Sequence, residues 1–189
     1  MVALSALARI SPAGLLGRVL AAVAFALLPL QAGAQASREL EIKAAFLFKF
    51  GDFVEWPEGA LAAGRPFTIG VMGAPEMAEE LARVTEGRTV QGRPVVVRRV
   101  LRDAVLDGLH VLFIGRGEAA NLASIIAGAD GLALLTVTDA ENAIARGSMI
   151  NFVAAQSKVR FDIALPPAER SGIRISARLL SVARKVVQS

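Results

Sequence analysis

The sequence predicts an α/β fold: a single three-layer domain with a mixed, mostly parallel sheet, a C-terminal antiparallel hairpin and a final helix. Apolar runs alternate with amphipathic stretches over residues 66–139, as in domains that alternate strands and helices. Two segments of alternating polarity then flank a short polar connection, Ala155-Gln156-Ser157, which indicates a hairpin. A helical pattern begins after Ser176, a suitable N-cap residue.

The N-terminal region, residues 1–36, predicts a cleavable signal peptide. Residues 1–18 carry basic residues and no acid, and the apolar run VLAAVAFALLPL follows. Small residues come next, so we expect cleavage after Ala34 or Ala36. The apolar run is far shorter than the roughly 20 residues of a membrane-spanning helix. The predicted mature domain therefore covers residues 37–189 and lies in the periplasm.

Charge and cysteine content exclude several function classes. Of the 21 basic residues two lie in the predicted signal peptide, and none of the 17 acids does, so the mature balance is 19 minus 17, or +2. The sequence after the predicted signal peptide has no block of five like charges, so no nucleic acid partner is predicted. The chain has no cysteine, which excludes disulfides and thiolate chemistry.

The stretch ELEIKAAFLFKFGDFVEWP, residues 39–57, predicts the first helix. Ser37 suits the N-cap, Glu39 and Glu41 suit the positive end of the helix dipole, and Pro57 closes the helix. The phenylalanines also alternate as in a strand. Length and the scarcity of β-branched residues favour a helix.

The aromatic residues of this helix form two groups: those on the predicted core face and those that lie outside it. A stripe at helical spacing predicts the core face: Ile42, Ala45, Phe46, Phe50 and Phe53, flanked by Leu47 and Val54. Phe48 lies on the other side, and Trp56 stands beside Glu55 at the helix end. Exposed aromatics often anchor partners, so Phe48, Glu55 and Trp56 are the predicted partner-binding residues. A second packing layer is the alternative.

The rest of the chain gives alternating elements. HVLFIG and GLALLTVTD are apolar throughout, which indicates strands covered on both faces. In VRFDIAL, Phe161 and Ile163 point one way and Arg160 and Asp162 the other. The last helix is predicted over ARLLSVARKVVQS. In order, we expect strands at residues 66–72, 95–100, 110–115 and 131–139, helices from Pro75 and from residue 117, a turn at Gln91-Gly92, and a short helix or loop at 102–109.

One motif resembles a dinucleotide site. The stretch GRGEAA, residues 115–120, matches G-x-G-x-x-A after a strand, and Asp139 ends the next strand. However, Glu118 places negative charge where a pyrophosphate would bind, and the motif is not in the first strand-to-helix turn. An ordinary strand-to-helix turn is the preferred interpretation, and no cofactor is predicted.

The sequence contains few residues or motifs suited to catalysis. The single histidine, His110, opens an apolar strand and is predicted to be a partly buried structural residue, without a second histidine to share a metal. No G-x-S-x-G elbow occurs. Asp52 and Glu55 share one face of the predicted helix, which is typical of a solvated surface. We therefore predict a protein that is not an enzyme and has no metal site.

Arginines recur at four-residue spacing around the start of the predicted last helix. Arg170, Arg174 and Arg178, with Ser176, are the predicted ligand-binding residues for a small anion or zwitterion or a peptidoglycan carboxylate. The alternative is a solvated face paired with acids such as Glu169.

Four blocks in order, ELEIKAAFLFKFGDFVEWP, HVLFIG, LLTVTD and GSMINFVAAQSKVRFDIALPPAERSGIRISARLLSVA, resemble the YfiR-like family of periplasmic regulators. The resemblance spans about residues 39–184. It implies an exported α/β protein that binds the periplasmic sensor region of an inner-membrane diguanylate cyclase and represses it, which lowers cyclic di-GMP and biofilm formation. Members of this family commonly carry cysteines, and redox state is one proposed input to them. This chain has no cysteine, so a disulfide switch cannot operate here.

The sequence is compatible with two functions. The first is this repressor of a diguanylate cyclase. The alternative is a periplasmic ligand-binding module that serves a sensor kinase or an outer-membrane receptor. The sequence leaves open a homodimer, a bound small ligand and association with peptidoglycan.

Overall fold

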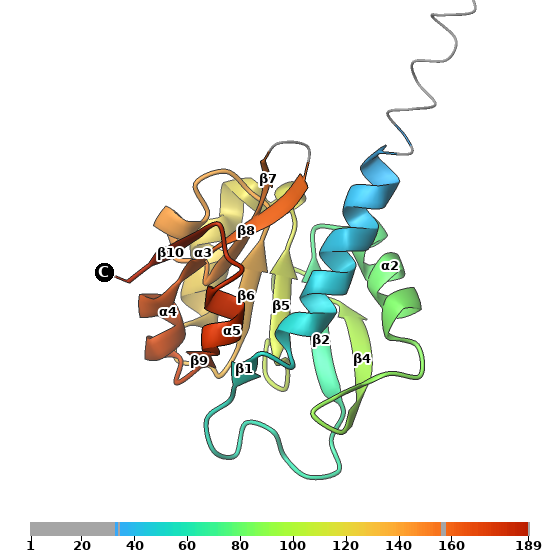
Figure 1. Cartoon of the computed structure of the whole chain (residues 1–189). Coiled ribbons are helices and arrows are strands. Elements are labelled where there is room, and N and C mark those ends of the chain that lie inside the picture. Colours follow the sequence, from blue (N-terminus) through green and yellow to red (C-terminus); the bar gives the residue numbers. More distant parts are fainter. Residues whose placement is uncertain (1–32, 34, 156–157, 189) are drawn as a thin grey trace, which may run out of the picture. The chain divides into compact units, whose positions relative to one another are not determined.

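A mixed sheet of eight strands forms the centre of the domain, in the order β10-β8-β7-β6-β5-β2-β4-β3 (Figure 1). Neighbouring strands are parallel except in the pairs β7–β8 and β3–β4. A separate antiparallel pair joins β1 to β9. The strands are β1 Val54–Glu55, β2 Phe67–Met72, β3 Thr89–Val90, β4 Arg93–Arg99, β5 Val111–Ile114, β6 Leu135–Thr138, β7 Ile150–Ala155, β8 Lys158–Ala164, β9 Arg174–Ile175 and β10 Lys185–Val187.

The computed structural model describes residues 33, 35–155 and 158–188. Residues 39–189 form one compact unit. The predicted signal peptide lies almost entirely outside the described residues and stays a prediction, as does the hairpin connection at residues 156–157. The helical segments are the N-terminal helix (residues 39–50 of this unit), α2 Pro75–Thr85, α3 Leu122–Ala129, α4 Leu165–Arg170, α5 Ala177–Leu180 and the 3₁₀ turns η1 Arg116–Asn121 and η2 Ile144–Arg146.

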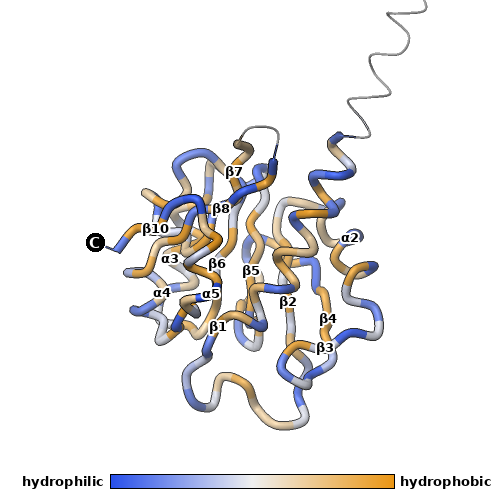
Figure 2. The backbone as a smooth tube through the Cα atoms, in the orientation of Figure 1, coloured by the Kyte–Doolittle hydropathy of each residue, from blue (hydrophilic) through white to orange (hydrophobic). Residues whose placement is uncertain are grey.

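Two apolar clusters cover the two faces of the sheet, which confirms the three-layer α/β prediction. Alternate residues of β5 divide between them: Val111 and Phe113 face one cluster, and Leu112 and Ile114 face the other. The first cluster includes residues of the N-terminal helix, α2, α4 and α5, and the second includes α3. Hydrophobic colouring accordingly runs through the central strands in Figure 2.

The buried face of the N-terminal helix differs from the predicted stripe. Ala44, Leu47 and Phe48 are buried, whereas Ile42 is 36% exposed. The buried face is rotated about the helix axis by roughly one residue from the predicted stripe. The stripe was a poor guide because apolar side chains lie on several sides of this helix. Residues of α2 share its core cluster, so cover from α2 as well as from the sheet determines which side is buried.

The N-terminal helix ends earlier than predicted, at residue 50 rather than at Pro57, and Ser37 lies within a helical stretch instead of capping it. A β-carbon on Gly51 would lie 2.8 Å from Val90 and 2.9 Å from Phe67, so the chain passes close to the sheet at this point. It then turns and forms β1. Asp52 and Glu55 therefore do not share a helix face.

The predicted strands, the turn at Gln91-Gly92 and the α2 start at Pro75 are confirmed. Gln91 and Gly92 both have positive φ, at 48° and 77°, as a tight hairpin turn requires. The hairpin of β7 and β8 is also confirmed, with Phe152 opposite Phe161.

The final helix is present but much shorter than predicted. Ser176 caps it, because its hydroxyl accepts a hydrogen bond from the Leu179 N–H at 3.3 Å. The helix α5 ends at Leu180, and residues 185–187 form β10, parallel to β8. The prediction of a helix over these residues was wrong because strand pairing with β8 outweighs their local preference. Arg184 secures the pairing: its N–H bonds to the Phe161 carbonyl at 2.8 Å, and its Nε bonds to Asp162 Oδ1 at 2.7 Å.

The glycines of the G-x-G-x-x-A motif serve a backbone contact. A β-carbon on Gly115 would lie 2.6 Å from the Ala74 β-carbon, and one on Gly117 would lie 2.7 Å from the Gly73 oxygen. The loops after β2 and β5 thus pack directly on each other. Glu118 bonds to Arg102, whose Nε lies 2.9 Å from the carboxylate.

Candidate functional site

The strand pair β1–β9 brings the two ends of the domain together. Val54 pairs with Ile175 and Glu55 with Arg174, and the Ser176 N–H bonds to the Phe53 carbonyl at 3.0 Å. Residues predicted separately for partner binding and for ligand binding are therefore neighbours. We call Phe53, Glu55, Trp56, Arg174 and Arg178 the β1–β9 patch.

Charged side chains dominate the exposed part of the β1–β9 patch. Arg174 Nε lies 2.9 Å from Glu55 Oε2, and the two side chains are 81% and 61% exposed. The Arg178 guanidinium lies over the Phe53 ring, 5.5 Å from its centroid. A surface ion pair of this kind contributes only about 0–1 kcal/mol to stability, so its charges are available to another molecule. Ser176, in contrast, is engaged as the cap of α5.

Trp56 is only partly exposed. Its ring packs edge-on against Phe67 at 5.7 Å and against His110 at 5.9 Å between ring centroids. Its Nε1 is buried and has no hydrogen-bond partner among the described residues. Trp56 thus belongs to the edge of the core as well as to the β1–β9 patch.

Phe48, the third predicted partner-binding residue, is buried with 4% exposure, so the expectation that it faces solvent was wrong. The Arg88 guanidinium lies 5.7 Å from the ring centroid and the Lys49 ammonium 5.3 Å from it. The segment after α2 therefore covers the side of the helix that the sequence left unexplained. Phe48 is a core residue with two cations at its margin.

His110 is buried, with 7% exposure, more deeply than the partial burial that the sequence predicted. Its Nδ1 accepts a hydrogen bond from the Thr68 N–H at 3.0 Å, and its ring stacks on Phe67 at 4.8 Å. Burial, which disfavours the charged ring, lowers the pKa of His110 below its usual value of 6.5.

This lowered pKa predicts that acid weakens the fold. Between the unfolded pKa of about 6.5 and the lower folded pKa, the unfolded chain binds more protons, so stability falls as the pH drops. We expect the melting temperature to fall between about pH 7.5 and about pH 5.5, and less so in His110→Gln, which cannot titrate. Thermal melts of both proteins at each pH check this. Parallel pH profiles would contradict it.

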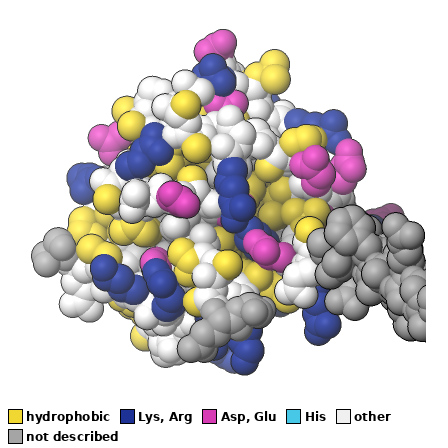
Figure 3. All heavy atoms as spheres, turned by 90° about the horizontal axis from the view of Figure 1, so that it is seen from above, with side chains coloured by type: hydrophobic (Ala, Val, Ile, Leu, Met, Phe, Trp, Pro, Cys, Tyr) yellow, Lys and Arg dark blue, Asp and Glu magenta, His cyan; other side chains and the backbone are white. Residues whose placement is uncertain are grey.

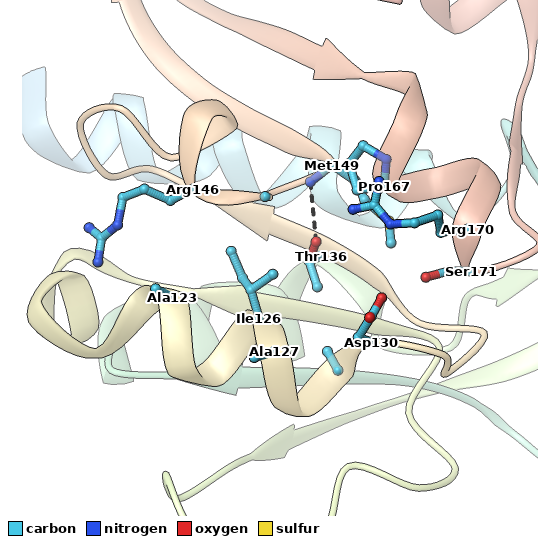
Figure 4. A pocket seen from close by; sticks show the side chains of 12 residues that line it. Ala123, Ile126, Ala127, Asp130, Thr136, Arg146, Met149, Pro167, Arg170 and Ser171 are labelled. Carbon is cyan, nitrogen blue, oxygen red and sulfur yellow. Dashed lines mark hydrogen bonds between the residues drawn. The ribbon is translucent and has the colours of Figure 1, made fainter. Parts of the chain in front are cut away.

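Arg170 lies apart from Arg174 and Arg178, because it ends α4 while the others belong to β9 and α5. It lines a pocket of about 250 Å³ between α3 and α4 (Figure 4). Figure 4 shows the side chains of Arg170, Ser171 and Asp130 around this pocket. Ile126, Met149 and Pro167 supply its apolar lining. The structure thus divides the predicted ligand-binding residues between two places.

Sequence reasoning missed one charged cluster. Lys43 is 6% exposed, and its Nζ bonds to Asp139 Oδ2 at 3.0 Å and to Glu39 at 2.7 Å. Arg116 Nε also lies 3.5 Å from Asp139 Oδ2. The only local signal was a lysine four residues after a glutamate, a spacing common on solvated helices. The partner Asp139 is 96 residues away.

The described residues contain no group of acids and histidine that could hold a metal, and no helix among them is long and apolar enough to cross a bilayer. Their surface offers ion-paired side chains and pockets.

These features define a single α/β domain with a mixed sheet covered on both faces. The chain belongs to the YfiR/HmsC-like family, whose sequence model matches residues 40–184. The family is one of periplasmic regulators, associated with membrane-bound diguanylate cyclases. A search of curated proteins gave no match.

Proposed function

We propose that this protein is a periplasmic, non-enzymatic repressor that binds the periplasmic sensor region of an inner-membrane diguanylate cyclase and lowers cyclic di-GMP and biofilm formation. The family match over residues 40–184 carries the proposal, since it covers nearly the whole described domain. Export to the periplasm rests on the predicted signal peptide.

We place partner binding on the β1–β9 patch. Its exposed charges are Glu55, Arg174 and Arg178, and its rings, Phe53 and Trp56, are partly exposed. The Arg178 guanidinium lies over the Phe53 ring. Arginine and aromatic side chains together are the composition of binding hot spots. Because both halves of the Glu55–Arg174 pair are exposed, each is free to re-pair with charges of a partner.

Deletion of the gene tests the regulatory role. We expect cyclic di-GMP and biofilm to rise in the deletion strain and to return to the original levels on complementation with the intact chain. Mass-spectrometric measurement of cyclic di-GMP checks this. Unchanged levels across growth media would overturn the proposal.

Complementation with charge variants tests the β1–β9 patch. The double variant Arg174→Ala/Arg178→Ala should fold normally and lose most repression, because it removes exposed charges only. Arg98→Ala, an exposed arginine of β4, is the matched control and should repress fully. The swap Glu55→Arg/Arg174→Glu keeps an ion pair while exchanging its charges, so it should also lose repression without loss of stability. Full repression by both patch variants would place partner binding elsewhere.

Crosslinking followed by mass spectrometry identifies the partner. Recovery of a membrane protein with a cyclase domain, linked near residues 53–56 or 174–178, supports the proposal. Recovery of a sensor kinase or an outer-membrane receptor in its place would favour the alternative ligand-binding role.

A further inference from the structure

The outer edge of β4 is open over most of its length. One side of β4 pairs with β2 from Val95 to Arg99, whereas β3 covers the other side only at Arg93 and Pro94. Beyond β3, the described part of the chain places no further strand on this side of the sheet (Figure 1). We call the outward side of residues 95–99 the β4 edge. An open strand edge is a template for pairing with another chain.

Backbone groups at the β4 edge alternate in direction. The Val95 N–H bonds outward to the Arg88 carbonyl at 3.3 Å, whereas the Val100 N–H bonds inward to a carbonyl of β2 at 2.8 Å. Because successive residues of a strand direct these groups to opposite sides, Val97 and Arg99 also face outward. The described residues supply no backbone hydrogen-bond partner for either of them on that side. Two residues thus offer both N–H and C=O groups to an added strand.

Exposed apolar side chains adjoin the β4 edge. Val96 lies on the face of β4 away from the first core cluster and is 40% exposed. Leu101 and Val105, in the loop that follows β4, are 80% and 73% exposed. These are three of the five large hydrophobic side chains that are exposed among the described residues. Apolar side chains of an added strand would pack beside Val96 as cross-strand neighbours.

The charge along this segment has one sign. Residues 88–102 contain five arginines and no acid. Two of these arginines, Arg99 and Arg102, form ion pairs with acids of other elements. Arg98, on the same face as Val96, is exposed and has no ion-pair partner within the described ranges. The end of the domain seen in Figure 3, in contrast, shows basic and acidic side chains intermixed.

These charges distinguish between two possible occupants of the β4 edge. A second copy of the chain, paired edge to edge, would bring the arginines of both copies together, and like charges on neighbouring strands are destabilising. A strand that carries carboxylates would instead form charge-assisted hydrogen bonds with Arg98. The charge of the edge therefore favours an acidic segment of a different protein.

We propose that the β4 edge binds an extended segment of another protein, rich in β-branched and acidic residues, which joins the sheet as a strand beside β4. In this recognition mode main-chain hydrogen bonds give affinity and side chains give specificity. Val97 and Arg99 supply the backbone groups, and Arg98 pairs with an acid of the segment. The β4 edge shares no residue with the β1–β9 patch, so this interaction is separate from the proposed repression.

Amide hydrogen exchange of the isotopically labelled protein tests the pairing. In the free protein the amides of Val97 and Arg99 should exchange fast, and those of Val96 and Arg98, which face β2, should exchange slowly. Peptides selected from a phage-displayed library of random heptapeptides are the probes. The selected sequences should combine Asp or Glu with Val, Ile or Thr, and their binding should protect Val97 and Arg99. The absence of any selected peptide that protects these two amides would overturn the proposal.

Variants of Arg99 separate the backbone contribution from the charge. Arg99→Pro removes an outward N–H and should bind the peptide roughly three- to tenfold more weakly than Arg99→Ala, which loses the same charge but keeps the N–H. If Arg99→Pro unfolds, a peptide N-methylated at alternate residues gives the same test, because one of its two registers should lose binding. Equal affinity of the folded Arg99 variants, or of the methylated and unmethylated peptides, would overturn strand addition.

Two further variants separate this interaction from repression. Arg98→Ala should weaken peptide binding by roughly tenfold, the loss of a charge-assisted hydrogen bond, and should still repress fully. Arg174→Ala/Arg178→Ala should bind the peptide normally. Unchanged affinity in Arg98→Ala would overturn the selection of an acidic segment.

Analytical ultracentrifugation tests the second copy as the occupant. The intact chain and Arg99→Ala/Arg98→Ala should sediment alike, because the β4 edge is not expected to pair with itself. A dimer that forms through residues 95–99, as shown by its loss in Arg99→Pro, would identify a second copy as the occupant and overturn the proposal.

Discussion

Replacing Phe50 with alanine lowers the free energy of unfolding by about 3–5 kcal/mol, which is the expected cost for a fully buried phenylalanine. Phe50 has no exposed surface, and its ring contacts Phe152 and Phe161 at centroid distances of 5.7 and 5.2 Å. Its removal leaves a cavity between the N-terminal helix and the β7–β8 hairpin. Urea unfolding followed by circular dichroism measures the loss.

Two other phenylalanines provide controls for this result. Phe46 joins the same aromatic group but is only partly buried, so Phe46→Ala should cost less than Phe50→Ala. Phe53 lies beneath Arg178 at the surface, and Phe53→Ala should cost least. Equal losses at the three positions would contradict the packing described for this helix.

Replacing Lys43 with methionine has the second large effect, a loss of about 3 kcal/mol, because it leaves a buried carboxylate without its closest cation. The side chains of Lys43 and Asp139 are 8% and 13% exposed. Methionine keeps most of the apolar stem, so the loss reports mainly on charge. In a double-mutant cycle, adding Asp139→Asn to Lys43→Met should recover part of the stability. Additive losses would show that the two residues do not interact.

The same variant has a signature in acid. The hydrogen bond from Lys43 lowers the pKa of Glu39 below its usual 4.5. The stability linked to this shift is present above pH 4.5 and is lost as the pH falls through the lower folded pKa. In Lys43→Met the pKa of Glu39 should rise toward its usual value, as an NMR titration of the glutamate side chains would show. An unchanged Glu39 pKa would contradict the contact.

Elements with a strong local signal were predictable. The runs around β5 and β6 are apolar throughout, and both strands are buried on both faces. Features set by distant pairing were not predictable. Residues 185–187 have helical neighbours in sequence, but β8 supplies hydrogen bonds that make them a strand. The burial of Phe48 likewise depends on cover by the segment after α2.

The candidate sites show the same division. The charged residues of the first and last sequence blocks predicted binding surfaces. Of these residues, Glu55, Arg174 and Arg178 lie at the surface. The four-residue spacing grouped Arg170 with Arg174 and Arg178. In the structure these residues belong to three different elements, because Arg170 ends α4, Arg174 lies in β9 and Arg178 lies in α5. The hollow lined by Arg116, Asp139 and Lys185 has no sequence signature, because its lining comes from strand ends, loops and the start of β10.

The joining of β1 to β9 has a consequence for the order of folding. Glu55 and Arg174 are 119 residues apart, and the N-terminal helix packs on Phe161 of the hairpin, so the first core element completes its contacts only when the last part of the chain is present. Contacts of such long sequence separation slow folding. If the predicted signal peptide directs the chain through a membrane, this delay would leave the core around the N-terminal helix incomplete until the last strands had been synthesised. Slow folding would thus assist translocation.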